Sequence, residues 1–243
     1  MHLSIIIPCY NEAKKIPEDI KAAELFFLNN NIQGEMILVD DGSSDYSSIQ
    51  AQETRVNEKI EKKVIHYRQN RGKGYAVRQG IAQSQGKYVM FADSGVCIDY
   101  QFALEGLKIL EAGQADIAHG SRKMAGSTIV RAQTWHRKIL SRMFKMFVSA
   151  FMGIPRHLTD TQCGFKMYRG DVAREIYKDA VVDGFIFDIE IILRAKKRGY
   201  SIAEFPVEWY CDHDTRVTPI LISGHILGEF WKIKRSLRDW RDT

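Results

Sequence analysis

Four short apolar runs, each followed by a polar or glycine-rich segment, constrain the fold of this chain more than any other feature. We expect strands at residues 3–7, 36–39, 63–67 and 87–92. The first two are continuous apolar runs, which is typical of strands buried on both faces. Segments with helical spacing lie between the strands, at residues 16–28, 46–58 and 75–84. Strands that alternate with helices predict parallel β-α-β units and an open, mostly parallel α/β sheet flanked by helices.

The second half of the chain is less regular. Residues 131–151 carry a broad apolar face at helical spacing with basic residues beside it, and a polar loop, HLTDTQCGFKMY, follows. We expect a helix at residues 187–198, a strand at 202–206 and a final segment at 219–240. The chain has no linker rich in Pro, Gly or Ser, which predicts a single domain, residues 1–243, with two functional halves.

Polar residues follow each of the four predicted strands. Because ligands of open α/β sheets bind beyond the carboxyl ends of the strands, these residues are expected to form a site at one edge. They are Pro8, Cys9, Tyr10, Asn11 and Glu12, then Asp40, Asp41, Gly42 and Ser43, then Asn70, Arg71, Gly72, Lys73 and Gly74, and finally Asp93, Ser94 and Gly95.

Three of these end segments carry recognisable chemistry. Asp40 and Asp41 could accept hydrogen bonds from a uracil imide or a ribose hydroxyl, or they could form an Asx turn before a capped helix. Lys73, at the start of a predicted helix between two glycines, favours a phosphate. Asp93 is either a turn residue or a ligand of a divalent ion that also binds a diphosphate, since such an ion needs only one or two protein carboxylates.

Two later segments add charged side chains. The polar loop offers Asp160 as a base and Lys166 as a phosphate-binding cation, although helix capping by Thr or Asp is equally consistent with its sequence. The segment GFIFDIEI places Asp188 and Glu190 among apolar residues, which raises a carboxyl pKa unless a cation or metal compensates. Buried acids at a helix start are the alternative reading of this segment.

Charge and cysteine content narrow the class of protein. Residues 117–159 contain eight Lys or Arg and no acidic residue, which predicts an anionic partner for this part of the chain. The four cysteines lie far apart, which favours reduced thiols in the cytoplasm. The first apolar run is too short for a signal peptide, and we expect neither export nor a spanning helix.

Seven motifs in order resemble family 2 glycosyltransferases of GT-A fold, and most closely the group of dolichyl-phosphate β-glucosyltransferases and dolichyl-phosphate mannose synthases. The motifs are IIIPCYNE, VDDGSSD, NRGKGYAVRQGI, FADSG, GSR, TDTQCGFKMY and GFIFDIEI. The resemblance implies an inverting transfer of a hexose from a nucleotide diphosphate sugar, with UDP-glucose favoured, to a polyprenyl phosphate. Residues 1–120 would then form the nucleotide-sugar half, and residues 121–243 the acceptor and membrane-facing half.

The resemblance also implies roles for individual residues. Asp93 would face a divalent metal, Mg²⁺ or Mn²⁺, and the residues near the sugar would be Asp160, Asp188 and Glu190. The acceptor phosphate would be received by Arg122, Arg131 and Lys166. The nucleotide pocket would be lined by Pro8, Tyr10, Glu12, Asp40, Asp41, Lys73 and Asp93.

One position departs from the family pattern. The family commonly has Asp-x-Asp after this strand, and Gly95 stands where the second aspartate is expected. Fewer protein ligands imply a weakly bound metal, whose affinity depends on a bound diphosphate.

A polyprenyl acceptor stays in the bilayer, so we expect peripheral association with the cytoplasmic face of the membrane. Apolar faces flanked by Lys and Arg, at residues 135–151 and 220–240, suit this role, and core packing or a homodimer interface are the alternatives. Two other functions stay open: transfer to a glycan or other soluble acceptor, and a non-catalytic nucleotide-sugar binding module. Nucleic acid is not expected as a partner, because the basic residues are mixed with an apolar face.

Overall fold

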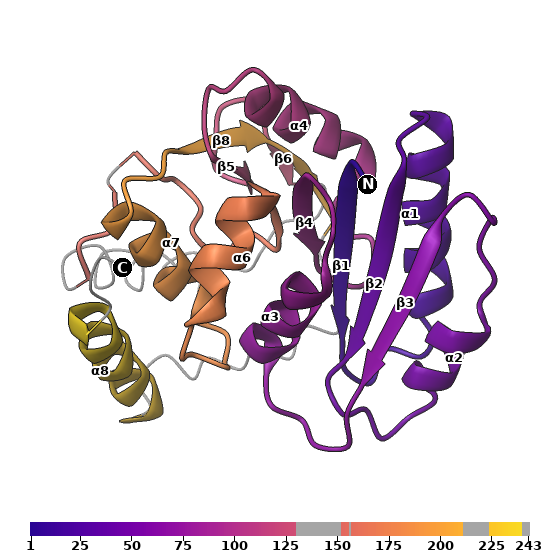
Figure 1. Ribbon diagram of the computed structural model, residues 1–243, viewed down its shortest axis with the longest axis horizontal. Coiled ribbons are helices and arrows are strands. Elements are labelled where there is room, and N and C mark those ends of the chain that lie inside the picture. The colour runs from indigo at the N-terminus through magenta and orange to yellow at the C-terminus, as the bar shows by residue number, and fades with distance from the viewer. Residues whose placement is uncertain (130–151, 156, 211–223, 240–243) are drawn as a thin grey trace.

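The structure, a computed structural model, describes residues 1–129, 152–155, 157–210 and 224–239 (Figure 1). Arg131, the apolar face predicted at residues 131–151 and part of the predicted C-terminal segment lie outside these residues. The described residues form one large sheet covered by helices on both faces, with a two-stranded sheet, β6 (Thr128–Ile129) and β9 (Glu208–Trp209), beside it.

The large sheet has seven strands in the order β3-β2-β1-β4-β7-β5-β8. Neighbouring strands are parallel except for β7, which runs antiparallel to both β4 and β5. The mostly parallel, open α/β sheet predicted from the sequence is therefore confirmed. The strands are β1 (Leu3–Cys9), β2 (Gly34–Asp40), β3 (Glu61–His66), β4 (Tyr88–Ala92), β5 (Ile117–Ser121), β7 (Phe165–Arg169) and β8 (Ile202–Pro206).

Strand β1 explains why its sequence reads as one apolar run. All seven of its residues are buried. Ile5 and Ile7 pack in the core on one face of the sheet, and Ile6 packs in the core on the other. A strand covered on both faces needs apolar side chains at successive positions, and each such side chain contributes about 1.5–3 kcal/mol through burial.

Helices form a layer on each face of the sheet (Figure 1). One layer contains α1 (Ile16–Asn29), α2 (Ser47–Glu53) and α4 (Ala103–Glu111), the last preceded by a 3₁₀ turn at Tyr100–Phe102. The other layer contains α3 (Lys73–Gln83), α6 (Gly170–Lys178) and α7 (Phe187–Lys197). Helix α8 (Gly224–Asp239) lies beside α7, with Arg194 donating to Ser236 Oγ at 2.7 Å.

Two sequence-based expectations for secondary structure were wrong. The helix expected at residues 46–58 ends at Glu53, because the chain turns into an extended conformation at Thr54. Lys62 Nζ donates hydrogen bonds to the carbonyls of Ala51 and Thr54, at 2.7 and 2.5 Å, and so stabilises this helix end. The C-terminal part of the predicted polar loop is strand β7, which is buried between β4 and β5. Because Lys166 is charged, the sequence pattern did not indicate a buried strand here.

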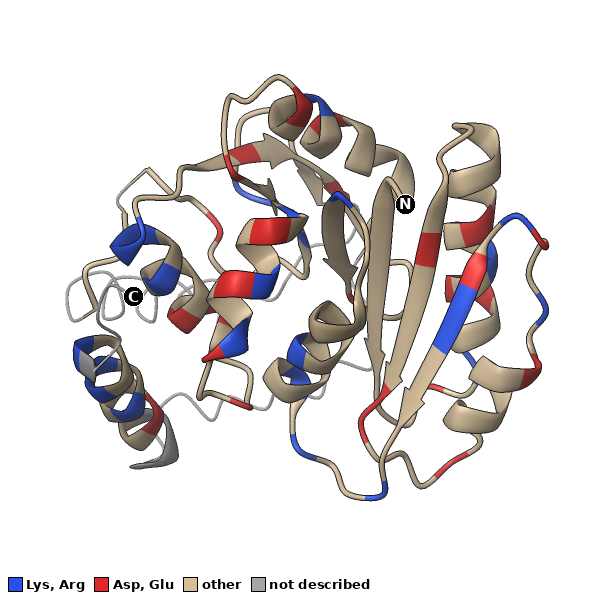
Figure 2. Ribbon diagram, in the orientation of Figure 1, with Lys and Arg blue, Asp and Glu red and all other residues tan. Residues whose placement is uncertain are grey.

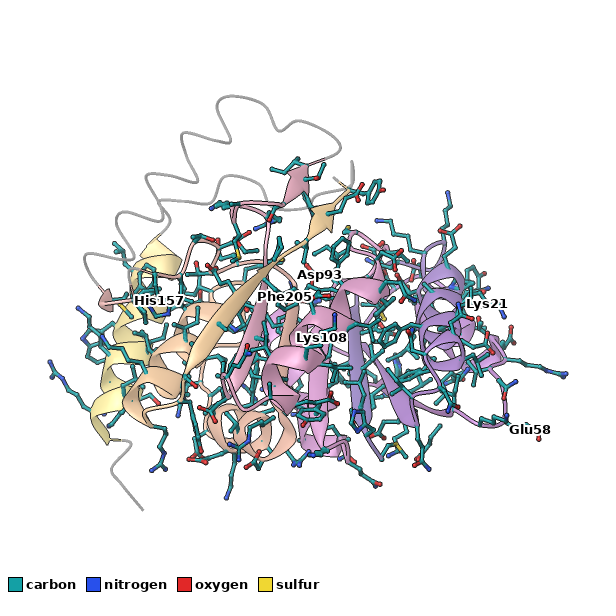
Figure 3. The ribbon with its side chains drawn as sticks, turned by 90° about the horizontal axis from the view of Figure 1, so that it is seen from above. Lys21, Glu58, Asp93, Lys108, His157 and Phe205 are labelled. Atoms are coloured by element: carbon teal, nitrogen blue, oxygen red, sulfur yellow. The ribbon has the colours of Figure 1, made fainter. Side chains whose placement is uncertain are left out.

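The parallel strands β1, β2 and β4 bring their carboxyl ends to the same edge of the sheet, as expected. Asp93, which follows β4, lies near the middle of the molecule, between the N-terminal and C-terminal elements (Figure 3). In the described part of the chain, no helix combines the length and the apolar character that crossing a bilayer requires.

Candidate active site

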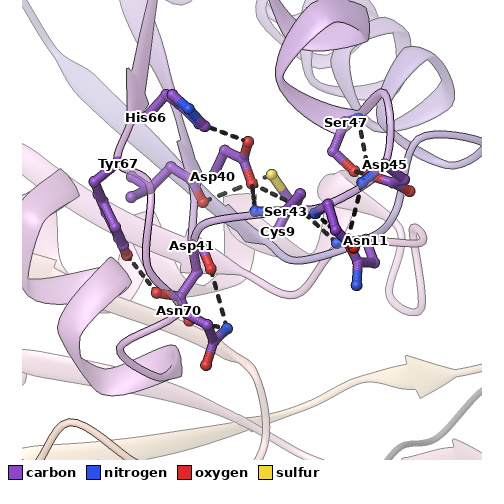
Figure 4. Close-up of polar contacts among 12 residues, drawn as sticks. Cys9, Asn11, Asp40, Asp41, Ser43, Asp45, Ser47, His66, Tyr67 and Asn70 are labelled. Carbon is purple, nitrogen blue, oxygen red and sulfur yellow. Dashed lines mark hydrogen bonds and ion pairs between the residues drawn. The ribbon is translucent and has the colours of Figure 1, made fainter.

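Two carboxylates at the end of β2 organise the loops around them (Figure 4). Asp40 accepts hydrogen bonds from Ser43 and lies 2.9 Å from His66 Nδ1. Asp41 accepts hydrogen bonds from the Tyr67 hydroxyl at 2.6 Å and from Asn70 Nδ2 at 2.8 Å. Both aspartates are buried, at 0% and 4% exposure, and their hydrogen bonds hold these loops in place.

The backbone of the loop after β3 also depends on Asp41. Its two carboxylate oxygens accept hydrogen bonds from Arg71 N at 2.9 Å and Gly72 N at 2.8 Å. Gly72 has a φ of 108°, and a Cβ there would lie 2.4 Å from the carbonyl oxygen of Asp183. Only glycine fits this close approach, so the loop is clamped between Asp41 and the segment before α7.

The loop after β1 is fastened to the loop after β2. Asn11 has a φ of 51°, a left-handed conformation that Asn tolerates better than most residues. Its side-chain oxygen accepts a hydrogen bond from Ser44 N at 2.8 Å, and its own N–H donates to Ser43 Oγ at 2.8 Å. The predicted nucleotide residues nearby are Pro8, which is buried in β1, Tyr10, which is 37% exposed, and Glu12, which pairs with Lys15 at 2.9 Å.

Lys73 and Asp93 form an ion pair at the edge of the sheet, with Nζ 2.5 Å from Oδ1. Burial disfavours the charge on Lys73, but the neighbouring charges of Asp93 and Asp188 outweigh burial and raise its pKa. Asp93 is fixed from the other side by Gly164, whose carbonyl accepts a hydrogen bond from Asp93 N at 2.9 Å. The structure thus joins the residue predicted to bind phosphate to the residue predicted to face the metal.

Lys166 and Asp188 form a second pair, this one fully inside the protein. Nζ of Lys166 lies 2.5 Å from Asp188 Oδ1 and donates to the carbonyl of Thr161 at 2.8 Å. Burial raises the pKa of Asp188, against the opposing charges of Lys166 and Lys73. Both lysines approach the same ring, with Nζ of Lys73 5.8 Å and Nζ of Lys166 6.0 Å from the centroid of Phe91. The two ion pairs are therefore neighbours.

Arg122 and Asp160 form the third pair. The guanidinium donates to both carboxylate oxygens, Nε to Oδ2 at 2.6 Å and Nη2 to Oδ1 at 2.9 Å. Burial alone would raise the pKa of Asp160, but the hydrogen bonds and charge of Arg122 lower it to about 2. Glu204 supports the loop by accepting hydrogen bonds from Thr159 N and Asp160 N at 2.7 and 2.8 Å.

Glu190, also predicted to lie near the sugar, makes its contacts within α7 and with the segment before it. Its carboxylate is 2.8 Å from Nη2 of Arg194, one helical turn further along α7, and accepts hydrogen bonds from Val181 N and Val182 N. Both Glu190 and Arg194 are 0% exposed. These contacts make Glu190 part of a buried pair that fixes the segment before α7.

Sequence reasoning missed two buried polar side chains near the site. His119 in β5 is paired in register with Lys166, and neither of its ring nitrogens has a hydrogen-bond partner among the described residues. Burial, together with the charge of Lys166, lowers the pKa of His119 well below its ordinary value, so the ring is neutral. Asp19 in α1 accepts hydrogen bonds from the loop after Asp93. One signal was available for Asp19, because this acid falls between Ile16 and Ala23 on the apolar stripe of α1.

Asp93 fits the role of a single protein ligand to a divalent ion. Its carboxylate is 40% exposed, and among the described residues no group of three metal-ligating side chains gathers around any point. Mg²⁺ characteristically keeps several waters and takes one or two carboxylates together with substrate phosphates. The residues present therefore suit a metal that arrives together with a diphosphate.

The chain resembles known proteins in both sequence and structure. A family model described as Glycosyl transferase family 2 matches residues 4–177. The chain is 31% identical to the dolichyl-phosphate beta-glucosyltransferase of Dictyostelium discoideum, covering 96% of this chain and 77% of that protein. It is also 31% identical to the dolichyl-phosphate beta-glucosyltransferase of Drosophila melanogaster, covering 99% of this chain and 77% of that protein.

Among solved structures, the chain resembles glucosyl-3-phosphoglycerate synthase from Mycobacterium tuberculosis in complex with Mn²⁺, UDP and glucosyl-3-phosphoglycerate. The TM-score is 0.65 at 18% identity, covering 97% of this chain and 78% of that one. At this identity the likeness establishes a shared fold.

Proposed function

We propose that this chain, which belongs to glycosyl transferase family 2 and is a glycosyltransferase of GT-A fold, transfers glucose from UDP-glucose. The acceptor that we propose is dolichyl phosphate or a related polyprenyl phosphate. The proposal covers the donor, the acceptor and inversion of configuration at the transferred carbon. It is supported by the two beta-glucosyltransferase relatives and by the arrangement of charges at the edge of the sheet.

The observation that carries the proposal is the group of three cation–carboxylate pairs at this edge: Lys73 with Asp93, Lys166 with Asp188, and Arg122 with Asp160. A transfer between two phosphate compounds brings two anionic groups to one sugar. Cations that are already desolvated bind such groups more strongly than cations in water, because the local dielectric is low.

On the donor side, we assign the diphosphate to Lys73 and the α3 N-terminus. The Lys73 ammonium and the positive end of the helix dipole both favour negative charge, and the N–H groups of Gly72 and Tyr75 already donate to Asp41 and to the Asp183 carbonyl. A divalent metal bound by Asp93 and the diphosphate would act as a Lewis acid and neutralise charge on the leaving nucleotide. Asp40 and Asp41 hold the surrounding loops in shape, so that the base and ribose would meet loops that are already held in place.

On the acceptor side, we assign the phosphate to Arg122. Arg131 lies outside the described residues, and Lys166 is buried in its pair with Asp188. A phosphate oxygen is already ionised near neutral pH and needs no base to attack the sugar. Asp160 suits this chemistry, because a carboxyl with a pKa of about 2 is a weak base. We assign Asp160 the role of orienting Arg122.

We also propose that α8 brings the protein to the cytoplasmic face of a membrane. Leu227 and Trp231 are 58% and 63% exposed on this helix. Basic residues gather on the same helix, as Figure 2 shows, at Lys232, Lys234, Arg235 and Arg238. Exposed apolar side chains flanked by Lys and Arg are typical of helices that lie in the interface of an anionic membrane.

A soluble hydroxyl compound is the second candidate acceptor, and Asp188 is the observation that favours it. A hydroxyl acceptor needs a base, and a carboxyl whose pKa is raised by burial is better suited to that task than Asp160. Its pairing with Lys166 makes this candidate the weaker one.

The test is incubation of the purified protein with UDP-glucose, Mg²⁺ or Mn²⁺, and dolichyl phosphate in detergent. We expect glucose to appear in the lipid fraction, with little product from dolichol, which lacks the phosphate. Transfer to dolichol or a soluble glycan at the same rate would favour the second candidate. No transfer from any common nucleotide sugar to either class of acceptor would contradict the proposed function.

A further inference from the structure

A buried carboxylate from helix α1 holds the loop that follows Asp93. Asp19 Oδ2 accepts a hydrogen bond from Ser94 Oγ at 2.5 Å. Its other oxygen, Oδ1, accepts from two successive backbone N–H groups, Gly95 N at 2.7 Å and Val96 N at 3.0 Å. Asp19 is 0% exposed and lies about seventy-five positions before this loop in the sequence. One side chain therefore fixes three consecutive residues of a distant segment.

The loop has an unfavourable backbone conformation. Gly95 has a φ of 98° and Val96 a φ of 45°. A positive φ is rare for a β-branched residue and persists only where surrounding contacts over-determine it. Successive N–H groups in such a turn form a concave site that binds an anionic oxygen, and Asp19 fills that site.

Burial of Asp19 is unfavourable for its charge. All three hydrogen-bond donors are neutral groups, and its neighbours Ile16, Ile20 and Ala23 on the same face of α1 are buried apolar residues. An apolar residue at this position would continue the stripe and avoid the desolvation penalty. The carboxylate is therefore explained by the loop that it holds rather than by the packing of α1.

The loop that Asp19 holds begins at Asp93. The segment is fixed at its start by the hydrogen bond from Asp93 N to the Gly164 carbonyl, and along residues 94–96 by Asp19. Between these two attachments, the Asp93 carboxylate points to Lys73 at 2.5 Å. The direction of this carboxylate thus depends on a conformation that the loop sequence alone would not keep.

We propose that Asp19 is a positioning residue of the donor site: its hydrogen bonds hold residues 94–96, with Gly95 and Val96 in the left-handed region, in the conformation that aims Asp93 at the metal and diphosphate. The proposal rests on the function proposed above. It gives Gly95 a role as well, because a glycine at this position adopts the required φ and donates its N–H to Asp19. Support for Asp93 comes from α1 in place of a second acidic ligand at position 95.

Two substitutions of Asp19 distinguish the effect of its hydrogen bonds from the effect of its side-chain volume. Asp19→Asn keeps an oxygen that can accept from both N–H groups, and its amide can donate to Ser94 Oγ. Asp19→Leu fills the space with an apolar group and removes every acceptor. Calorimetric titration with UDP in the presence of Mn²⁺ gives the affinity, and hydrogen exchange at the amides of Gly95 and Val96 reports directly on the loop.

We expect Asp19→Leu to weaken binding of UDP with Mn²⁺ by about tenfold or more, since the loop must be ordered on binding. The amides of Gly95 and Val96 should exchange quickly in Asp19→Leu and slowly in the wild type and Asp19→Asn. Should Asp19→Leu not fold, Ser94→Ala removes one of the three hydrogen bonds and should give a smaller loss in the same direction.

Three results would overturn the inference: wild-type affinity in Asp19→Leu, wild-type affinity in Ser94→Ala when Asp19→Leu does not fold, or an equal loss of affinity in Asp19→Asn and Asp19→Leu. A wild-type protein that binds no UDP, with or without Mn²⁺, would instead contradict the proposed function. The inference would then fall with it, even if the exchange measurements show that Asp19 orders the loop.

Discussion

Nζ of Lys73 lies 2.5 Å from Oδ1 of Asp93, so the cation assigned to the diphosphate and the carboxylate assigned to the metal form an ion pair with each other. If Asp93 holds a metal and Lys73 a phosphate of the nucleotide, as proposed above, binding of the metal–nucleotide complex would break this ion pair. The two ligands should therefore bind cooperatively, and each should bind weakly alone.

The first prediction concerns Lys73. Lys73→Met removes the phosphate-binding charge and should weaken UDP binding in the presence of Mn²⁺ by about 10–100-fold, the value of one charge-assisted hydrogen bond. The same variant frees Asp93, so Mn²⁺ alone should bind more tightly than it does to the wild type. Electron paramagnetic resonance of free Mn²⁺ measures both effects. Weaker binding of Mn²⁺ alone would show that the ion pair does not restrain Asp93.

A second prediction concerns the close contact between Gly164 and Asp93. A Cβ at position 164 would lie 2.0 Å from Asp93 Oδ2, which forces the carboxylate to move. Gly164→Ala should therefore abolish measurable Mn²⁺-dependent UDP binding. Gly228→Ala is the matched control, because a Cβ there meets nothing within 4 Å. Unchanged binding in Gly164→Ala would mean that the position of Asp93 is unimportant.

The Arg122–Asp160 pair gives a third prediction, which separates stability from acceptor binding. Arg122→Met leaves a buried carboxylate without its cation and should lower the free energy of unfolding by about 3–5 kcal/mol. The double variant Arg122→Met with Asp160→Asn should recover most of that stability. Its KM for polyprenyl phosphate should nevertheless stay about 10–100-fold above the wild-type value. Recovery of both quantities would assign Arg122 a structural role alone.

The pH dependence of stability tests the burial of Asp19. Burial raises the pKa of this carboxyl from 3.8 to about 6, against the hydrogen bonds from residues 94–96. Because the folded state holds the proton more tightly than the unfolded chain, the contribution of Asp19 to stability falls as pH rises from about 4 to 6, by about 3 kcal/mol. Other charged or titratable groups that face Asp19 are Glu12, Cys9 and Tyr100, and all three stay in the variant.

Asp19→Asn removes only this titration. The variant should unfold at a higher temperature than the wild type at pH 7.5, and the difference should shrink as the pH falls below 6. Differential scanning calorimetry across this range measures it. A constant difference between the two proteins at every pH would show that Asp19 does not titrate with a raised pKa.

Much of the structure of residues 1–120 could be predicted from sequence, because local patterns there coincide with the tertiary structure. The apolar runs of β1 and β2 are continuous since both faces of these strands are covered, and the segments after them are polar since they lie at the open edge. The motif resemblance that led to family 2 glycosyltransferases is confirmed by the family match over residues 4–177.

The partnerships within the site could not be predicted in this way. Asp19 and Ser94 are far apart in sequence and meet only because α1 packs beneath the loop after β4. The sequence predicted a polar loop around Lys166, because a charged residue does not suggest a buried strand. The burial of Lys166 is explained by its ion pair with Asp188, which comes from a helix further along the chain. The partner of Glu190 could have been inferred from the sequence, since Arg194 follows four residues later in the same helix.

The most direct test of the whole account is the anomeric configuration of the product formed from UDP-α-glucose and dolichyl phosphate, measured by NMR of the purified glycolipid. Attack by the acceptor phosphate on the face opposite the leaving nucleotide would invert the configuration, so we predict dolichyl β-glucosyl phosphate. An α-linked product, or the absence of any lipid-linked glucose although UDP and Mn²⁺ bind, would contradict it.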